Sequence, residues 1–88
     1  MAESSRPENQ TDRLLSRFRD LYPVLEAFYP LASGVDRRLV EDFPREPSWR
    51  VIAALRRHVL DPRYLRAVAD GEFRYTLDGQ REGPVSEE

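Results

Sequence analysis

The stretch SWRVIAALRRHVLDPRYLRAVADGEFRYTLDG, residues 48–79, contains most of the signals that decide the fold. In its first part apolar residues recur at helical spacing, and Ser48 is a good N-cap, so we predict a helix over 49–60. A helical wheel divides this helix into a face that should pack inward and an opposite, exposed face. The inward face carries Val51, Ile52, Leu55, His58 and Val59, and the exposed face carries Arg50, Ala53, Ala54 and Arg57.

The rest of this stretch predicts a short helix and a hairpin. Asp61, followed by a proline, begins a helix that should end near Ala69, because an Asp-Gly pair comes next. Residues 73–77 then alternate and are rich in aromatic and β-branched side chains. The second Asp-Gly pair, at 78–79, is the usual two-residue turn, and it predicts a return strand over 80–85.

Prolines and caps divide the N-terminal half into further helices. We expect a first helix to begin at Thr11 or Asp12 and to end before Pro23. A short helical turn over 24–28 and another helix over 36–43 follow from the apolar spacing. The predicted fold class is therefore mainly α with a small β-hairpin (α+β).

The two ends of the chain differ from the middle. Residues 1–10 and 86–88 are polar and show no periodicity, so we expect disordered ends around one domain over 11–85. The net charge of −2 argues against a nucleic-acid ligand, but the acids gather near the ends. Residues 13–81 hold 13 arginines against 10 acidic residues, a balance that permits RNA binding.

Composition also limits the location and the chemistry. The 88 residues include no cysteine, so disulfides and thiolate metal sites are excluded, and we expect no cofactor and no metal site. No run approaches the roughly 20 apolar residues that span a bilayer, and no signal peptide follows Met1, so we expect a cytoplasmic protein.

A catalytic site finds little support in the sequence. His58 is the only histidine and lies beside apolar residues of its helix, so we interpret it as a core or boundary histidine rather than a general base. Glu41 and Asp42 fit a solvated helix edge better than a pair of metal ligands, and no nucleophile or phosphate-loop motif occurs. We therefore predict a protein without enzymatic activity.

The arginines are the best candidates for ligand binding. Arg50 and Arg57 are seven residues apart, about 10.5 Å along a helix, which can straddle successive phosphates. A solvated helix face would show the same pattern. Arg63 and Arg74 belong to a second cluster, in which Tyr64 adds an aromatic surface beside a guanidinium. The alternative reading of Tyr64 is a core residue with its hydroxyl at the rim.

An ordered set of short signals resembles the ProQ/FinO family of bacterial RNA chaperones over about 60 of the 88 residues, most closely its short, single-domain members. The resemblance implies a helical domain with a small hairpin, whose concave face grips structured RNA. The typical target is a stem followed by a single-stranded 3′ tail, as in terminators and small regulatory RNAs. The set comprises PLASGV at 30–35, ALR at 54–56, RYL at 63–65 and LDG at 77–79, with Gly71, Arg74, Gly83 and Val85 at matching intervals.

Carried over by position, the resemblance implies that Tyr64 and Arg74 belong to the RNA face, with Arg56 and Arg63 as further basic positions. The other candidates come from the residues themselves, including the free amides expected where Ser48 begins its helix. We expect a monomer that acts on small regulatory RNAs and mRNA 3′ ends in post-transcriptional regulation, without a membrane partner. The candidate RNA-binding residues are Tyr64, Arg74, Arg56, Arg63, Arg50, Arg57 and Ser48.

The sequence also departs from the family at individual positions. Ala32 and Ile52 stand where some members have basic residues, and Thr76 stands where the family has an aspartate in the hairpin. The long members also bear basic linkers and a second domain. These departures concern the affinity more than the kind of ligand.

Two other interpretations stay open. The first is a protein–protein interaction module with a solvated arginine-rich surface, whose exposed apolar patch would include Trp49, Phe28 and Tyr29. The second is a helix-turn-helix protein that binds duplex DNA. We consider it less favoured, because its recognition helix over 62–69 would run into the acidic Asp70.

Overall fold

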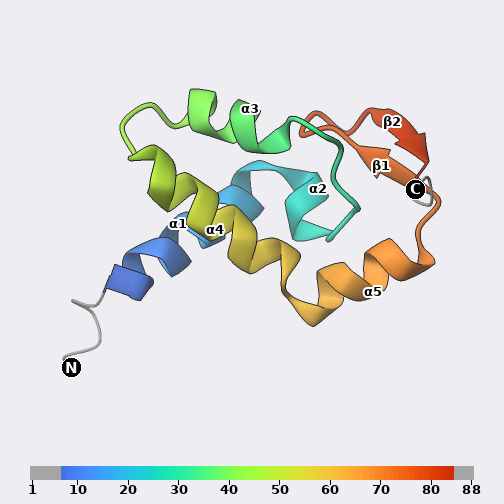
Figure 1. Ribbon diagram of the computed structural model, residues 1–88, viewed down its shortest axis with the longest axis horizontal. Helices are drawn as coiled ribbons and strands as arrows, with labels where there is room; N and C mark the ends of the chain where they lie inside the picture. The colour runs from blue at the N-terminus through green and yellow to red at the C-terminus, as the bar shows by residue number, and fades with distance from the viewer. Residues whose placement is uncertain (1–6, 85–88) are drawn as a thin grey trace.

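The computed structural model describes residues 7–84, which form helices followed by a two-stranded antiparallel sheet (Figure 1). The predicted fold class, mainly α with a small β-hairpin, is confirmed. None of the helices in this range is long and apolar enough to cross a membrane. The elements are α1 (Pro7–Leu21), α2 (Pro23–Glu26), α3 (Val35–Asp42), α4 (Ser48–Val59), α5 (Pro62–Asp70), β1 (Phe73–Tyr75) and β2 (Arg81–Pro84).

Helix α1 begins earlier than the sequence predicts. It starts at Pro7, about one turn before Thr11 or Asp12, so the predicted start is wrong. Proline suits the first turn of a helix, where the missing N–H has no partner to lose. Thr11 is buried inside the helix rather than placed at its cap. Of the residues expected to be disordered, 7–10 lie in α1, whereas 1–6 and 86–88 lie outside the described residues.

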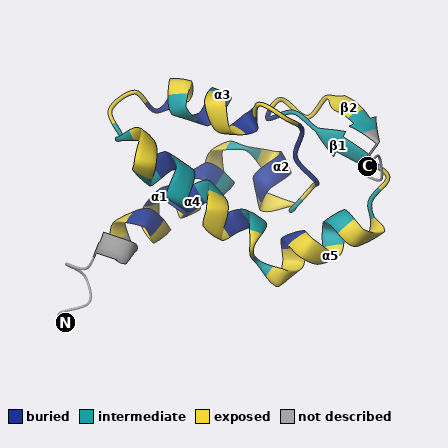
Figure 2. Cartoon of the chain, viewed as in Figure 1, coloured by how far each residue is buried: buried dark blue, intermediate teal, exposed yellow. Residues whose placement is uncertain are grey.

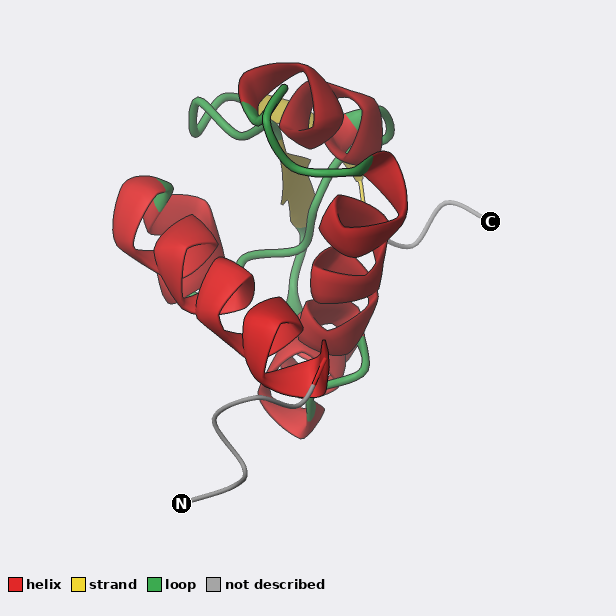
Figure 3. Ribbon diagram, turned by 90° about the vertical axis from the view of Figure 1, so that its left-hand side faces the viewer, coloured by secondary structure: helices red, strands yellow, loops and turns green. Residues whose placement is uncertain are grey.

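The core lies between helices that are far apart in the sequence. Helix α1 packs along α4, and α3 and α5 also contact α4. Buried positions line the inner sides of the helices (Figure 2), and in the side view the strands lie behind them (Figure 3). The residues with no exposed surface are Phe18, Leu25, Leu39, Val51, Ala54 and His58.

The inward face of α4 is rotated from the predicted one. Val51 and His58 are buried as predicted, but Ala54, expected outside, has no exposed surface. Ile52, expected inside, is partly exposed. Hydropathy favours the larger isoleucine, whereas a close contact between helices favours a small side chain such as alanine. This rotation leaves an apolar residue on the outer side of α4.

The two predicted helix caps have different outcomes. Asp61 caps α5 as predicted, because its carboxylate accepts a hydrogen bond from the Arg63 amide at 2.8 Å. Ser48 is not a cap: Pro47 occupies that position, and Ser48 is the first residue of α4. The carbonyl of Pro47 accepts the amides of Arg50 and Val51.

The hairpin turn has three residues instead of the predicted two. Thr76 pairs with Gln80, and the amide of Gly79 also donates to the Thr76 carbonyl at 2.9 Å. Gly79 has a φ of 88°, which suits the left-handed position that ends such a turn. The extra residue is Leu77, which is 4% exposed and belongs to the core. Burial of this leucine explains why the two-residue prediction is wrong.

Candidate nucleic-acid interface

The segment from Pro30 to Ala32 runs parallel to β1. The Tyr75 amide donates to the Pro30 carbonyl at 2.8 Å, and the Ala32 amide donates to the Tyr75 carbonyl at 2.9 Å. In extended backbone, successive peptide groups point to opposite sides. The N–H and C=O of Leu31, between these two partners, therefore point away from β1.

Two side chains from different elements form hydrogen bonds with the N–H and C=O of Leu31. The Leu31 amide donates to the Tyr64 hydroxyl at 3.0 Å, and the Arg74 Nη1 donates to the Leu31 carbonyl at 3.0 Å. We call this arrangement (the Leu31 backbone, the Tyr64 hydroxyl and the Arg74 guanidinium) the Leu31 clamp. It joins α5, the 30–32 segment and β1 at one point. The two residues that the family resemblance pairs are thus brought together.

Tyr64 does not offer a stacking surface. Its side chain is 7% exposed, lies in the hydrophobic core and tilts against the His58 ring at 5.4 Å. A base needs an open aromatic face, so the expected stacking of a base on Tyr64 is wrong for this arrangement. Its hydroxyl proton, however, has no acceptor among residues 7–84, so the group can still donate.

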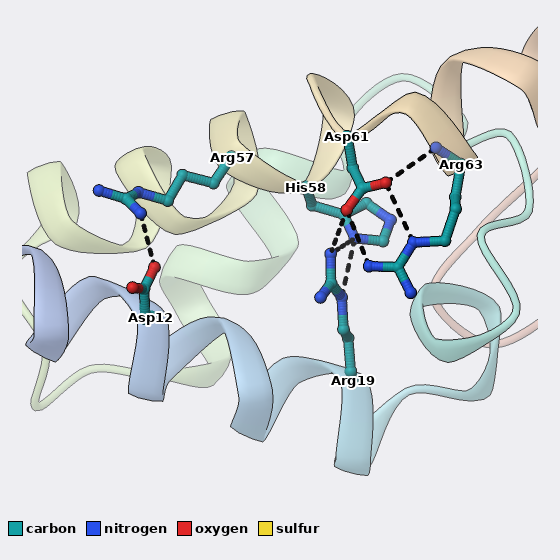
Figure 4. A network of polar contacts seen from close by, with 6 residues as sticks. All are labelled: Asp12, Arg19, Arg57, His58, Asp61 and Arg63. Carbon is teal, nitrogen blue, oxygen red and sulfur yellow. Dashed lines mark hydrogen bonds and ion pairs between the residues drawn. The ribbon is translucent and has the colours of Figure 1, made fainter.

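Arg57 lies beside a carboxylate between α1 and α4, and Arg63 lies beside another at the junction of α4 and α5 (Figure 4). Arg57 pairs with Asp12 of α1 at 2.6 Å, and Arg63 pairs with Asp61 at 2.9 Å. The Arg63 guanidinium also lies 4.4 Å from the centre of the Phe28 ring. Both cations are partly neutralised in the protein itself.

A buried histidine completes this network. The Nδ1 of His58 accepts hydrogen bonds from Arg19, and Arg19 also lies 3.8 Å from Asp61 (Figure 4). Because a guanidinium only donates, neutral His58 carries its proton on Nε2, which is buried without a partner among the described residues. Burial, and then the nearby charge of Arg19, lower the pKa of His58 to about 4. The predicted core histidine is confirmed, and it is neutral at pH 7.

The same network keeps the Asp61 carboxylate ionised at low pH. Hydrogen bonds from the side chain and the amide of Arg63 lower the pKa of Asp61 to about 2. The carboxylate thus caps α5 and holds Arg63 at once. Sequence reasoning found the cap but not Arg19, because that residue lies 42 positions away on α1.

The remaining candidates lie elsewhere on α4. Arg50 pairs with Glu46 at 3.0 Å, in a hollow that Arg13 and Arg17 also line. Arg56 and Ser48 are exposed and line a groove on the outer side of α4, where Arg56 has no carboxylate partner among the described side chains of residues 10–83. The structure therefore divides the predicted residues among several places. Tyr64 and Arg74 meet at the Leu31 clamp, whereas Ser48, Arg56 and Arg57 line the groove on α4.

The aromatic residues named for an interaction patch do not form a single patch. Trp49, 60% exposed, lines the groove on α4. Phe28 and Tyr29 line a different cavity, between α2, α5 and the hairpin. As for metals, the described side chains, those of residues 10–83, include no group of three or more carboxylates or histidines suited to hold an ion.

Comparisons with known proteins point to one family. The profile described as the ProQ/FINO family matches residues 6–88. The structure is similar to the crystal structure of NMB1681 from Neisseria meningitidis MC58, described as a FinO-like RNA chaperone. The TM-score is 0.85 and the identity is 32%, over 90% of this chain and 84% of that one. No curated protein matches the chain.

Proposed function

The chain belongs to the ProQ/FinO family of RNA chaperones, and from this membership we propose that its RNA is a stem followed by a single-stranded 3′ tail. Members of this family are not enzymes, so the function is binding. We further propose that the protein acts as a monomer in post-transcriptional regulation, on small regulatory RNAs and mRNA 3′ ends. Such RNAs occur in the bacterial cytoplasm, which is where we expect it to act.

The Leu31 clamp is the observation that carries this proposal. After Leu31 is satisfied, the Tyr64 hydroxyl still has a proton to donate, and Arg74 still has N–H groups without a partner among residues 7–84. A cluster of donors, one of them charged, suits oxygen atoms of a phosphate or a ribose. We therefore assign the end of the RNA tail to the clamp, held by hydrogen bonds rather than by stacking on Tyr64.

The other arginines support binding of the phosphate backbone. Arg56 is the strongest of them, because it is exposed and no carboxylate neutralises it among the side chains described, those of residues 10–83. The first amides of α4, which follow Pro47, add a local positive potential near Ser48. Arg50, Arg57 and Arg63 already pair with carboxylates, so they add less net positive charge for a phosphate than Arg56 does.

A gel-shift assay tests the proposal directly. The purified protein is titrated with a hairpin RNA that has a 3′ tail, with the same hairpin without the tail, and with duplex DNA of matched length. We expect the tightest binding to the tailed hairpin and the weakest to the duplex DNA. Equal affinity for the two hairpins would contradict the role of the tail, and no binding to either RNA would contradict the proposed function.

A further inference from the structure

The outer face of α4 exposes apolar side chains that do not pack in the core. We define this outer face by Trp49, Ile52, Ala53, Arg56 and Leu60, which line a groove of about 540 Å³. Trp49 and Leu60 are 60% and 65% exposed, whereas the opposite side of the helix is buried in the core. Large apolar groups left in water mark a binding surface more often than a structural one.

The Trp49 ring is held in place from one side. The Arg50 guanidinium lies 5.0 Å from the centre of the ring, and the Arg50 Nη1 is itself fixed by Glu46 at 3.0 Å. With one side covered and more than half of the side chain exposed, the indole still offers surface to a ligand. A ring that is already ordered loses little conformational freedom on binding.

The charges around this groove favour a polyanion. Among the described residues that line it, Arg56 and Arg57 are cationic and none is a carboxylate. Arg56 lies seven positions after Trp49, which is about 10.5 Å along the helix and within reach of a neighbouring phosphate. Aromatic faces beside arginines are the usual means of holding single-stranded nucleic acid without sequence preference.

We infer that the outer face of α4 is a second RNA site, where an unpaired base stacks on Trp49 while Arg56 binds the adjoining backbone. This inference rests on the proposed RNA-binding function and deepens it. The stacked base belongs to single-stranded RNA, because a base inside a stem has no free face. The Leu31 clamp contains no exposed ring, so it does not supply this stacking surface.

Trp49 is the only tryptophan in the chain, so its fluorescence reports on this site alone. The wild-type protein is titrated with the tailed hairpin RNA, and binding is followed in parallel by the anisotropy of a label on the RNA. We expect the tryptophan emission to be quenched with the same midpoint as the anisotropy. The Trp49→Ala variant should bind about five- to a hundred-fold more weakly, and Trp49→Phe should recover most of the affinity.

The matched control is Leu21→Ala, which removes another large exposed apolar side chain, 57% exposed, at the end of α1. This variant should bind RNA like the wild type. If the RNA binds but the emission and the affinity of Trp49→Ala stay unchanged, the second site is wrong and the proposed function stands. If Trp49→Ala alters only self-association, the face is an interface between copies and the inference is overturned. If the wild type does not bind RNA, both the second site and the proposed function are overturned.

Discussion

Tyr64 and Arg74 hold the same residue from two sides: the Tyr64 hydroxyl accepts the Leu31 amide and the Arg74 guanidinium donates to the Leu31 carbonyl, each at 3.0 Å. One partner comes from α5 and the other from β1, so their geometry depends on the whole C-terminal half of the fold. Because the bond between Tyr64 and Leu31 is buried, Tyr64 has a structural role as well as any role in binding.

The two roles of Tyr64 separate in the Tyr64→Phe variant. Loss of the hydroxyl leaves the buried Leu31 amide without an acceptor, which should lower the free energy of unfolding by about 1–3 kcal/mol. Urea unfolding measures this loss. We also expect weaker binding of the tailed hairpin under conditions where the variant is folded. Full affinity with reduced stability would assign Tyr64 to the core alone.

Replacement of Gly71 should destabilise the junction between α5 and the 30–32 segment. A Cβ at this position would lie 2.8 Å from the Ala67 carbonyl oxygen and 3.0 Å from Pro30 Cγ. Gly71→Ala should therefore lower the free energy of unfolding by about 1–3 kcal/mol, as overpacking does. The exposed neighbour Glu72 provides the comparison, since Glu72→Ala should change stability by less than about 0.5 kcal/mol. Equal stabilities of the two variants would contradict this packing.

Stability should depend on pH through His58. Its pKa is about 4 in the folded protein and 6.5 as a free group, so between these values the unfolded chain binds more protons. The free energy of unfolding should stay constant above pH 6.5 and fall as the pH is lowered, by up to about 1.4 kcal/mol per pH unit. Urea unfolding between pH 5 and 7 measures the slope.

The control for this slope is His58→Gln, which has no titrating group at the position. The variant should be less stable overall but nearly insensitive to pH in this range. A flat profile for the wild-type protein would mean that His58 is protonated equally in both states.

The salt dependence of the RNA affinity reports how many arginines contact phosphates. Two of the candidates, Arg56 and Arg74, have no carboxylate partner among the side chains of residues 10–83. Each phosphate contact contributes about 0.7–0.9 to the slope of log affinity against log salt. We therefore expect a slope magnitude of about 2 for the tailed hairpin, measured by anisotropy over a salt series. A magnitude near 4 would show that the ion pairs of Arg50, Arg57 and Arg63 open on binding. A slope near zero would favour the protein–protein interaction module.

Local signals predicted most of the fold. From the prolines and the Asp61 cap, the bounds of α3, α4 and α5 were predicted to within one residue of the observed ones. The features that the sequence did not predict depend on contacts between distant segments. The Pro30–Ala32 segment beside β1, the burial of Ala54 and the turn around Leu77 all follow from tertiary packing.

For the candidate site too, the sequence predicted some features, and contacts between distant segments decided the others. Family resemblance paired Tyr64 with Arg74, and the structure joins them through the backbone of Leu31, a role that the PLASGV signal at 30–35 did not indicate. Helical spacing suggested that Arg50 and Arg57 bind phosphates, but it could not show their carboxylate partners. Asp12 lies 45 positions from Arg57, so only the packing of α1 on α4 reveals that pair.

The tail preference of the Arg74→Ala variant tests the Leu31 clamp most directly. Affinities for the hairpin with and without its 3′ tail are measured for the wild type, for Arg74→Ala and for Arg37→Ala, an exposed arginine of α3 outside the candidate set. Circular dichroism first confirms that each variant is folded. We predict that Arg74→Ala binds the tailed RNA about ten- to a hundred-fold more weakly and binds both hairpins equally, while Arg37→Ala keeps the preference. A folded Arg74→Ala variant that still prefers the tailed hairpin as strongly as the wild type would contradict the account.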